Sequence, residues 1–423
     1  MNEIKQKKLL ILGATNDEIV IIGRAKSLGL YTIVTDYHTD WSLSPAKSVA
    51  DEAWNISWSD ISLLAEKSRA VGIDGVIAGF SEFRVENMIK LCRELGLPCY
   101  INDEQLEITR DKLRFKDYCR QFGIPVVREY DINDNNIVFP VIVKPADRAG
   151  SIGINVAYNR KDYEDYLKIA LSLSPSDRVI VEDFIEDGIK FDCYYVINNS
   201  VVDLIMTSDT LMYSNSARGH ETIQKAWMMP SLYEGEFLKQ NDEKIRNMIR
   251  HLGFENGCAN ISCFYKDGSF FVFEAGFRLT GELSCDYQYA DSDSSHLDTL
   301  IKHSLGLPVQ GYIKPSKHKK AFTNNLYMTT SCAETVKSIE GLDALKKDAS
   351  VISAMPEILL GAEVQPDSPT KFAMITFLAD TFEEVRRKVD LINKTVCVKT
   401  ESSSVYYSDS DVPDEVLKKY WKE

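Results

Sequence analysis

The feature that most constrains the fold is a change of pattern along the chain, from alternating strands and helices to paired strands. Residues 8–36 predict a strand, a helix and a strand, with Thr15 and Glu18 suited to a capping box and Gly29 ending the helix. The apolar run 75–79 and a helix that stops at Gly96 repeat this order. Alternation of this kind builds a parallel sheet with helical crossovers.

The middle of the chain predicts antiparallel hairpins instead. One charged helix is expected over residues 104–123, followed by the strand 124–130. Further on, the runs FDCYYVI and SVVDLIM meet at Asn198 and Asn199, and the runs CANISCFY and SFFVFEAG meet at Asp267 and Gly268. The fold class is therefore a combination of α/β and α+β.

The length of the chain calls for more than one domain. Its 423 residues exceed the roughly 250–300 at which a single core stops growing. We expect domains at residues 1–108, 109–312 and 313–423, the middle one divided between 184 and 185. The last begins after Pro308, Gly311 and Pro315, and carries the strand KFAMITFLAD and a helix capped by Thr381 and Glu384.

Composition excludes several classes of function. Lys and Arg total 49 and Asp and Glu total 63, and the net charge of −14 would repel nucleic acid. The nine cysteines contain no C-x-x-C pair, which argues against a disulfide framework or a zinc set. No apolar run approaches the ~18 residues that span a membrane, and Thr15 interrupts the N-terminal run before it could form a signal peptide. We expect a soluble cytoplasmic protein.

One lysine stands at the end of an apolar strand and just before a glycine-containing loop, in the stretch PVIVKPADRAGSIGI. The run buries the stem of Lys144, and a buried ammonium needs an anion nearby. Gly150 and Gly153 let backbone N–H groups approach an oxyanion, and Ser151 adds a hydroxyl. A phosphate-binding loop and an ordinary turn both fit this stretch, with the turn favoured about two to one when it is taken alone.

A carboxylate in an apolar strand gives the second indication. Glu274 follows three large apolar residues, where an unpaired charge is costly. If the preceding hairpin turns at residues 266–268 with a bulge, Glu274 shares a face with Asn260 and Ser262, and these oxygen ligands suit Mg²⁺. A structural ion pair between Glu274 and Arg278 is an equally supported alternative. A dinucleotide fold, suggested by the spacing of Gly13 and Asp36, is disfavoured because its fingerprint needs three glycines.

The order of these parts resembles the ATP-grasp superfamily, and most closely its carboxylate–amine ligase branch, which is related to the carbamoyl-phosphate synthase large chain and to purine-biosynthetic ligases. The motifs are Lys112 after TRD, Lys144 before AGSIG, the segment VEDFIEDG and the segment FEAGFRLTGE. The resemblance runs from about residue 7 to residue 395. It implies a pre-ATP-grasp domain, an ATP-grasp domain with a lid-bearing and a metal-binding part, and a small C-terminal α/β domain.

The resemblance also implies roles for single residues. Lys112 and Lys144 match the lysines that contact ATP phosphates, and Arg278 matches the arginine that meets the acyl or transferred phosphate. The mobile loop over the phosphates is matched by Ala149, Gly150, Ser151 and Gly153. The strand that receives adenine is matched by Glu182, Asp183, Phe184 and Ile185. Glu274 matches a magnesium-bridging carboxylate, and Asn260 is a candidate second ligand.

Three positions depart from the family pattern. Lys190 stands where many relatives have a ribose-binding glutamate, so we keep it as a nucleotide-binding candidate. Ser262 replaces a second acidic metal ligand, and Gly276 replaces an asparagine. Both changes weaken the metal site, although water and phosphate oxygens commonly complete a Mg²⁺ shell.

The function that the resemblance implies is an ATP- and Mg²⁺-dependent (or Mn²⁺-dependent), ADP-forming ligase that joins a small carboxylic acid to an amine through an acyl phosphate. Amino-acid substrates and a homodimer are compatible with it. The polar stretch SARGHETIQ could line the acceptor pocket, with Arg218 as carboxylate clamp and His220 as base, or could be a surface loop. A purine-pathway or carboxylase-type ligase and a non-catalytic ATP-binding module are the alternatives.

Overall fold

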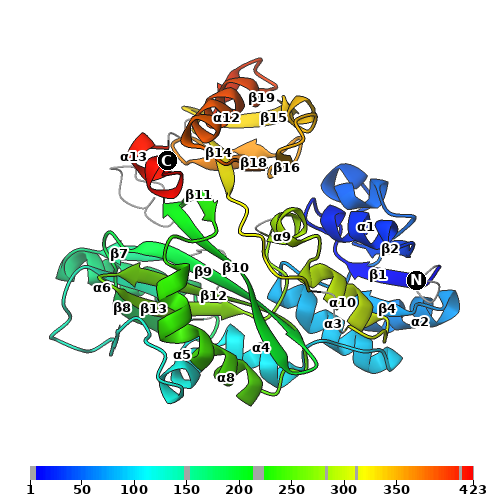
Figure 1. Ribbon diagram of the computed structural model, residues 1–423, viewed down its shortest axis with the longest axis horizontal. Helices are drawn as coiled ribbons and strands as arrows, with labels where there is room; N and C mark the ends of the chain where they lie inside the picture. The colour runs from blue at the N-terminus through cyan, green and yellow to red at the C-terminus, as the bar shows by residue number, and fades with distance from the viewer. Residues whose placement is uncertain are drawn as a thin grey trace.

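The computed structural model describes residues 6–146, 153–212, 223–281, 284–309, 313–408 and 412–422. Figure 1 shows the N-terminal unit beside the central sheet, with the C-terminal strands and helices above both. Within the described residues, the strands form four sheets, three of four strands each and one of eight.

The N-terminal unit is the parallel α/β sheet that the sequence predicts. Its strands have the order β3-β2-β1-β4, and β1 pairs in parallel with both β2 and β4. The elements are β1 (Lys8–Leu12), α1 (Glu18–Ser27), β2 (Tyr31–Thr35), β3 (Glu52–Trp54), α2 (Ile61–Val71), β4 (Gly75–Ile77) and α3 (Glu82–Leu95), with short 3-10 turns η1 (Trp41–Leu43) and η2 (Pro45–Ser48).

The expected capping box at the first helix does not form. Asp17 is the N-cap of α1, two residues after Thr15, the position that a box with Glu18 would need. The Glu18 carboxylate is fully buried, accepts bonds from the backbone N–H and hydroxyl of Thr15, and pairs with Arg84 at 2.5 Å. Glu18 therefore ties the first turn to α3, because a buried carboxylate requires a cation as well as hydrogen bonds.

The single charged helix expected over residues 104–123 is two helices, α4 (Asp103–Arg110) and α5 (Lys112–Gln121). Asp111 separates them in an extended conformation, and its carboxylate accepts bonds from Leu113 N and Arg114 N. An aspartate with free backbone donors ahead of it competes with helix continuation by capping a new helix. The break places Lys112 at the N-terminus of α5.

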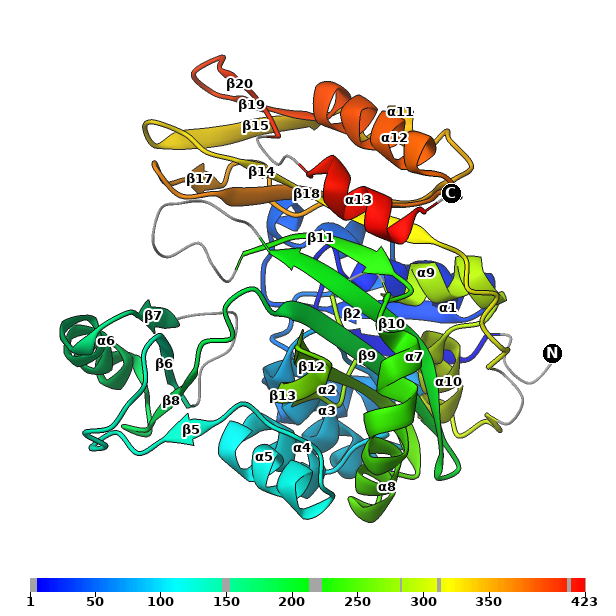
Figure 2. The same cartoon turned by 60° about the vertical axis from the view of Figure 1, so that its left-hand side comes forward.

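A small antiparallel sheet follows, with the order β5-β8-β6-β7, and we call it the lid sheet. Figure 2 shows that this sheet and its helix stand to one side of the large sheet. Its elements are β5 (Glu129–Tyr130), β6 (Val141–Pro145), β7 (Asn155–Ala157), α6 (Arg160–Leu173) and β8 (Val179–Asp183).

The eight-stranded sheet has the order β13-β12-β9-β10-β11-β14-β18-β16 and therefore joins the middle of the chain to its last third. Its strands are β9 (Ile189–Asn198), β10 (Val201–Met212), β11 (Gln224–Met229), β12 (Asn256–Lys266), β13 (Ser269–Gly276), β14 (Ala321–Met328), β16 (Val351–Pro356) and β18 (Thr370–Leu378). Both predicted hairpins form, with turns at Asn199–Ser200 and Asp267–Gly268 in the left-handed region. The bulge of the second hairpin lies between Ser262 and Cys263 rather than at the turn.

The remaining helices lie around this sheet. They are α7 (Glu234–Phe237), the π-helical turn η3 (Leu238–Asp242), α8 (Glu243–His251), α9 (Ser284–Ser292) and α10 (His296–Ser304). The C-terminal segment adds a sheet ordered β17-β15-β19-β20. Its elements are β15 (Glu334–Glu340), α11 (Leu342–Leu345), β17 (Glu363–Val364), α12 (Phe382–Thr395), β19 (Cys397–Thr400), β20 (Val405–Tyr407) and α13 (Asp414–Tyr420). Thr381 caps α12 as predicted, accepting from Glu384 N.

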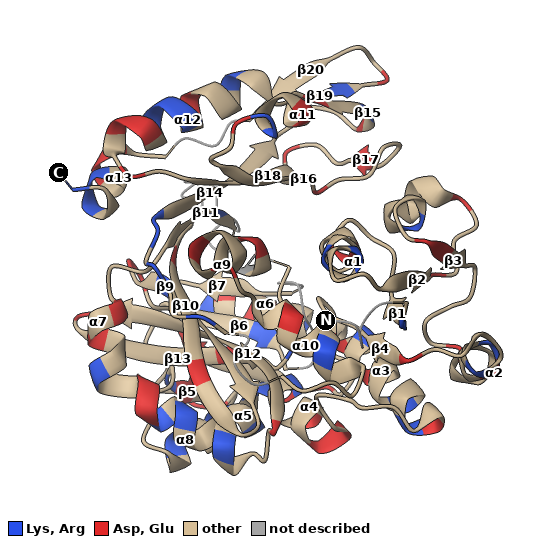
Figure 3. Ribbon diagram, turned by 45° about the vertical axis from the view of Figure 1, so that its right-hand side comes forward, with Lys and Arg blue, Asp and Glu red and all other residues tan. Residues whose placement is uncertain are grey.

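The two faces of the large sheet differ in chemistry. On one face Phe191, Tyr195 and Phe270 pack with Phe237 and with the buried side of α8 in a continuous apolar core. The other face, which we call the polar face, carries Lys190, Asp192 and Ser262 at neighbouring positions of β9 and β12. Charged residues colour outer helices such as α8 and α12, while most of the ribbon is uncharged (Figure 3).

None of the helices described is both long and apolar enough to cross a bilayer.

Candidate functional site

Lys144 ends β6 with its side chain buried, as the sequence predicts. Its ammonium forms an ion pair with Glu182 of β8, the neighbouring strand of the lid sheet. Burial lowers the pKa of Lys144, and the nearby ammonium groups of Lys116 and Lys112 lower it further, while the Glu182 carboxylate opposes the shift. Three positive charges therefore converge at one edge of the lid sheet.

Lys116 is a member of this cluster that sequence reasoning missed. It lies one turn after Lys112 in α5, is fully buried, and pairs with Glu182 at 2.5 Å and with Glu129 at 3.0 Å. Burial alone would raise the pKa of Glu182, but Lys144 and Lys116 outweigh it and lower that pKa. The available signal was the spacing of Lys112 and Lys116, because residues four apart share one face of a helix.

The segment predicted to receive adenine lies at the end of β8, where the lid sheet leads into β9. The Glu182 carboxylate is already held by two lysines, and Asp183 accepts a bond from the Tyr130 hydroxyl at 2.7 Å. The N–H of Phe184 donates to Pro140 O, and Ile185 O accepts from Gly188 N. Adenine binding by this segment stays a prediction.

The predicted phosphate loop connects β6 to β7. Of its four predicted residues, Ala149, Gly150 and Ser151 lie outside the described residues. Gly153 has φ +76°, and a Cβ built there would come within 2.9 Å of Leu173 and 3.0 Å of Pro145. Glycine is required at this end of the loop because the backbone is left-handed and the space is closed.

The polar face of the large sheet carries a row of directly opposed residues across β13, β12 and β9: Glu274, Ser262 and Asp192. Ser262 Oγ donates to Asp192 Oδ1 at 2.5 Å, and the buried Lys190 ammonium lies 2.6 Å from Asp192 Oδ2. Glu274 itself is exposed and has no ion pair within the described part of the chain. The prediction that Glu274 shares a face with Asn260 and Ser262 is confirmed.

Several buried polar atoms on this face have no hydrogen-bond partner among the residues that the structure describes. These atoms are Ser208 Oγ, Trp227 Nε1, Asn260 Nδ2 and Asn325 Oδ1. The strand pairing places all four residues on the same side of the sheet as Asp192. Natural proteins leave few buried polar groups unpaired, and those that remain call for a ligand or water. The polar face is therefore a surface built to receive polar groups from outside the chain.

The ion pair between Glu274 and Arg278, the alternative that the sequence left open, does not form. Arg278 instead donates through Nε to Glu82 of α3 at 2.7 Å. Burial alone would raise the pKa of Glu82, but Arg278 and Lys112 outweigh it and lower that pKa. Because β13 ends at Gly276, the arginine has already left the sheet and reaches the N-terminal unit. The Glu82 carboxylate therefore lies near two positive charges, those of Arg278 and Lys112.

Arg218 and His220, the predicted acceptor residues, lie outside the described residues, in the connection between β10 and β11. Their roles stay predictions. The described ends of that connection, Met212 and Gln224, are paired neighbours in the large sheet.

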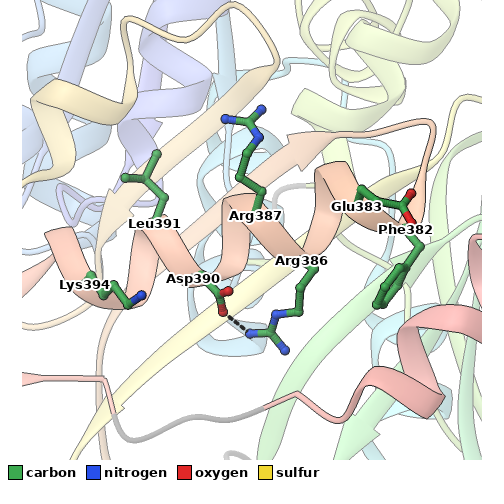
Figure 4. A pocket seen from close by; sticks show the side chains of 7 residues that line it. All are labelled: Phe382, Glu383, Arg386, Arg387, Asp390, Leu391 and Lys394. Atoms are coloured by element: carbon green, nitrogen blue, oxygen red, sulfur yellow. Dashed lines mark hydrogen bonds and ion pairs between the residues drawn. The ribbon is translucent and has the colours of Figure 1, made fainter.

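A hollow of about 520 Å³ along α12 is separate from this site. Figure 4 shows its seven lining side chains, all from that one helix, with Arg386 paired to Asp390. It holds none of the residues described above, so it adds nothing to the candidate site.

Comparison with known proteins agrees with this geometry. Residues 128–275 match the family model described as D-ala D-ala ligase C-terminus. The carbamoyl phosphate synthase large chain of Mycobacterium sp. (strain JLS) is 23% identical over 258 residues, 59% of this chain and 23% of that one. The chain thus spans about a quarter of the length of the curated relatives of this kind.

Two solved structures show the same fold over most of the chain. The L-amino acid ligase from Bacillus licheniformis has a TM-score of 0.74 at 18% identity, covering 93% of this chain and 98% of that one. Phosphoribosylglycinamide synthetase from Anaerococcus prevotii has a TM-score of 0.71 at 19% identity, covering 93% and 99%. These likenesses show that the chain has the ATP-grasp fold, as the sequence predicts.

Proposed function

We propose that this protein is an ATP-dependent, ADP-forming ligase that joins a small carboxylic acid to an amine through an acyl phosphate. The observation that carries the proposal is that Lys112 lies near both Lys144 of the lid sheet and Glu82, and that Glu82 holds Arg278 just beyond the strand that bears Glu274. Phosphoryl transfer needs positioning and neutralisation of charge more than covalent participation by the protein. This arrangement supplies both.

In this proposal Lys144 and Lys112 bind the ATP phosphates. The Lys116–Glu182 pair fixes the Lys144 stem, so the ammonium does not have to be ordered when the nucleotide arrives. The loop ending at Gly153 closes over the phosphates and excludes water, which would otherwise hydrolyse the acyl phosphate. Lys190, already paired with Asp192, lines the nucleotide side of the polar face rather than contacting bulk solvent.

The residues present fit a Mg²⁺ ion that arrives with ATP. Glu274 offers a carboxylate that has no ion pair within the described part of the chain, and the side-chain oxygen of Asn260 on the same face would supply a second ligand. No group of three or more His, Cys, Asp and Glu residues that could hold a metal occurs among the described residues. Mg²⁺ accepts such a site because phosphate oxygens and water complete its shell, and when bound it would neutralise charge on the transferred phosphate.

The chemistry proceeds in two displacements. A carboxylate oxygen of the acid attacks the γ-phosphorus, the bond to the β–γ bridging oxygen breaks, and ADP leaves. The amine nitrogen then attacks the acyl carbon, the carbon–oxygen bond to phosphate breaks with its electron pair, and the amine gives up one proton. Arg278, held by Glu82, neutralises the phosphate as it becomes the leaving group.

The relatives support this class without fixing the substrates. One structural neighbour is an amino-acid ligase and another is a phosphoribosylglycinamide synthetase, and all nine cysteines are free thiols, as in a reducing cytoplasm. We propose that this chain acts in the cytoplasm on small molecules.

The test is release of ADP against libraries of carboxylic acids and amines. We expect ADP formation that requires one acid and one amine, and at least a 100-fold loss of rate in Lys144→Ala and in Glu274→Gln. Exposed Glu383→Gln on α12 serves as the matched control and should leave the rate unchanged. Release of AMP would reject the mechanism, and ATP binding without turnover across the libraries would favour a non-catalytic module.

A further inference from the structure

A cavity of about 400 Å³ lies where the first and last parts of the chain meet α9. Its walls come from the start of α1, from Asp286 of α9, from Lys346 beside α11 and from the whole of β16. This volume falls within the range of small-molecule sites, roughly 300–1,000 Å³. The Asn16 side-chain nitrogen donates to Pro356 O at 3.0 Å and holds the two ends of the cavity together.

The cavity is lined by one half-buried carboxylate, that of Asp286. Burial raises the pKa of Asp286 to about 6, and the one group that lowers it is the hydroxyl of Ser353. Among the described residues, no lysine, arginine or histidine pairs with Asp286. A carboxylate in this position is costly unless a cation from outside the chain reaches it.

A lysine stands at another part of the same wall. Lys346 lines the cavity, and its ammonium pairs with the exposed Asp343 at 3.3 Å. Exposed ion pairs of this kind contribute little, so Lys346 can exchange this partner for another carboxylate. The cavity therefore presents one negative and one positive group to its contents.

Apart from Asn16 and Ser353, the rest of the lining is apolar. It comes from Ile19 and Val20 at the start of α1 and from Val351, Ile352, Ala354, Met355 and Pro356 of β16. Burial of an aliphatic or aromatic side chain between these walls is favourable, at roughly 25 cal/mol per Å². A ligand with an ammonium, a carboxylate and an apolar side chain matches all three features.

One close approach and one stretch of sequence relate this cavity to the proposed reaction centre. Asn16 precedes Asp17, and a Cβ built at Gly281 would lie 3.8 Å from Asp17 Oδ1. Gly281 follows Arg278 by three residues and precedes α9, which carries Asp286. The cavity is thus next to the segment that leads away from the proposed phosphate-binding arginine.

We propose that this cavity binds a zwitterionic α-amino acid with an apolar side chain, with its ammonium on Asp286 and its carboxylate on Lys346, as the amine substrate of the ligase. The assignment rests on the proposed function for the role of the ligand, but its binding can be measured without turnover. None of the site residues predicted from the sequence lines this cavity.

Binding is tested by isothermal titration of the full chain with L-alanine, L-valine, L-leucine, L-methionine and L-phenylalanine, with and without Mg²⁺ and a non-hydrolysable ATP analogue. For leucine, isoamylamine lacks the carboxylate and 4-methylpentanoate lacks the ammonium. We expect leucine to bind more tightly than isoamylamine, and 4-methylpentanoate to bind least. Failure of every amino acid in the panel to bind would overturn the proposal.

Two charge variants assign the contacts. Asp286→Asn should weaken binding of leucine and isoamylamine by at least about 30-fold. Lys346→Gln should weaken leucine by about 5-fold and leave isoamylamine unchanged, because only leucine has a carboxylate. The matched controls are Asp293→Asn, just after α9, and Lys347→Gln, next to Lys346, neither of which lines the cavity. Equal affinities of Asp286→Asn and Asp293→Asn would overturn the assignment.

Hydroxylamine separates failure of this inference from failure of the proposed function, because it captures an acyl phosphate without using the amine site. Wild type and Asp286→Asn should form hydroxamate from ATP and the acid at equal rates, while Asp286→Asn loses amide formation through a raised KM for the amino acid. Absence of hydroxamate from wild type with every acid would reject the ligase. Hydroxamate in both proteins with an unchanged KM for the amino acid would reject only the cavity assignment.

Discussion

Removal of Lys116 tests how much the buried ion pairs around Glu182 contribute to the free energy of unfolding. Glu182 pairs with Lys116 and Lys144, and Glu129 pairs with Lys116 and Arg120. Glu182 is 2% exposed, so its charge has almost no access to water. Lys116→Met takes one of its two lysines from Glu182 in this dry environment and leaves Glu129 with Arg120 alone.

The expected loss of stability follows from removing one partner of a buried ion pair while the other partner stays buried. Removal of one partner typically lowers the free energy of unfolding by about 3–5 kcal/mol, which for a domain of 150–250 residues is on the order of 10 °C in the unfolding temperature. The measurement is thermal unfolding by circular dichroism, with urea titration at pH 7 as a second method. The Lys144 ammonium should stay on Glu182, so ATP affinity should fall by less than about 10-fold.

A double variant removes the carboxylate that Lys116→Met leaves without its lysine. Lys116→Met combined with Glu129→Gln keeps the Lys144–Glu182 pair, and should recover at least half of the lost free energy. Arg120→Gln is the control, because its partner Glu129 lies nearer the surface and the change should cost less than about 1 kcal/mol. A Lys116→Met protein as stable as wild type, or a double variant that is less stable than either single one, would refute the reasoning.

Three further predictions test the site and its surroundings. Glu82→Gln frees the Arg278 side chain and should lower the rate of ADP release by about 10- to 100-fold at unchanged ATP affinity; equal rates would contradict an orienting role. Burial raises the pKa of Asp209 to about 6, so the folded protein retains a proton that the unfolded chain releases above about pH 4. The free energy of unfolding should therefore fall by up to about 3 kcal/mol as the pH rises from 4 to 6, and urea titrations should show that Asp209→Asn removes this part of the slope. Gly153→Ala should destabilise the protein by about 1–3 kcal/mol in the same titrations, because its φ is +76° and its Cβ would meet Leu173; an unchanged midpoint would show that the loop end relaxes.

Local patterns were sufficient to predict the architecture of the N-terminal unit and both hairpins. The apolar runs, the stop at Gly29 and the turn residues Asp267 and Gly268 act within a few positions, and the structure confirms them. The helix over residues 104–123 was the main error, since helical periodicity continues through Asp111 while the aspartate caps a new helix. The capping box of Thr15 and Glu18 is incomplete for the opposite reason: the Glu18 carboxylate still accepts from Thr15 N, but it also pairs with Arg84, 66 positions away, and the helix begins only after Asp17.

The sequence by itself determined which residues carry charge at the ends of strands: Lys144 after an apolar run, Glu274 within one, and Lys112 and Arg278 nearby. These assignments depend on periodicity and on the cost of burying a charge, both of which are local. Only the tertiary structure decided the partners. Arg278 lies with Glu82 rather than Glu274, Lys116 joins Glu182, and Asp286 meets β16 across a cavity, because pairing energies depend on distances between segments that the order of residues does not specify.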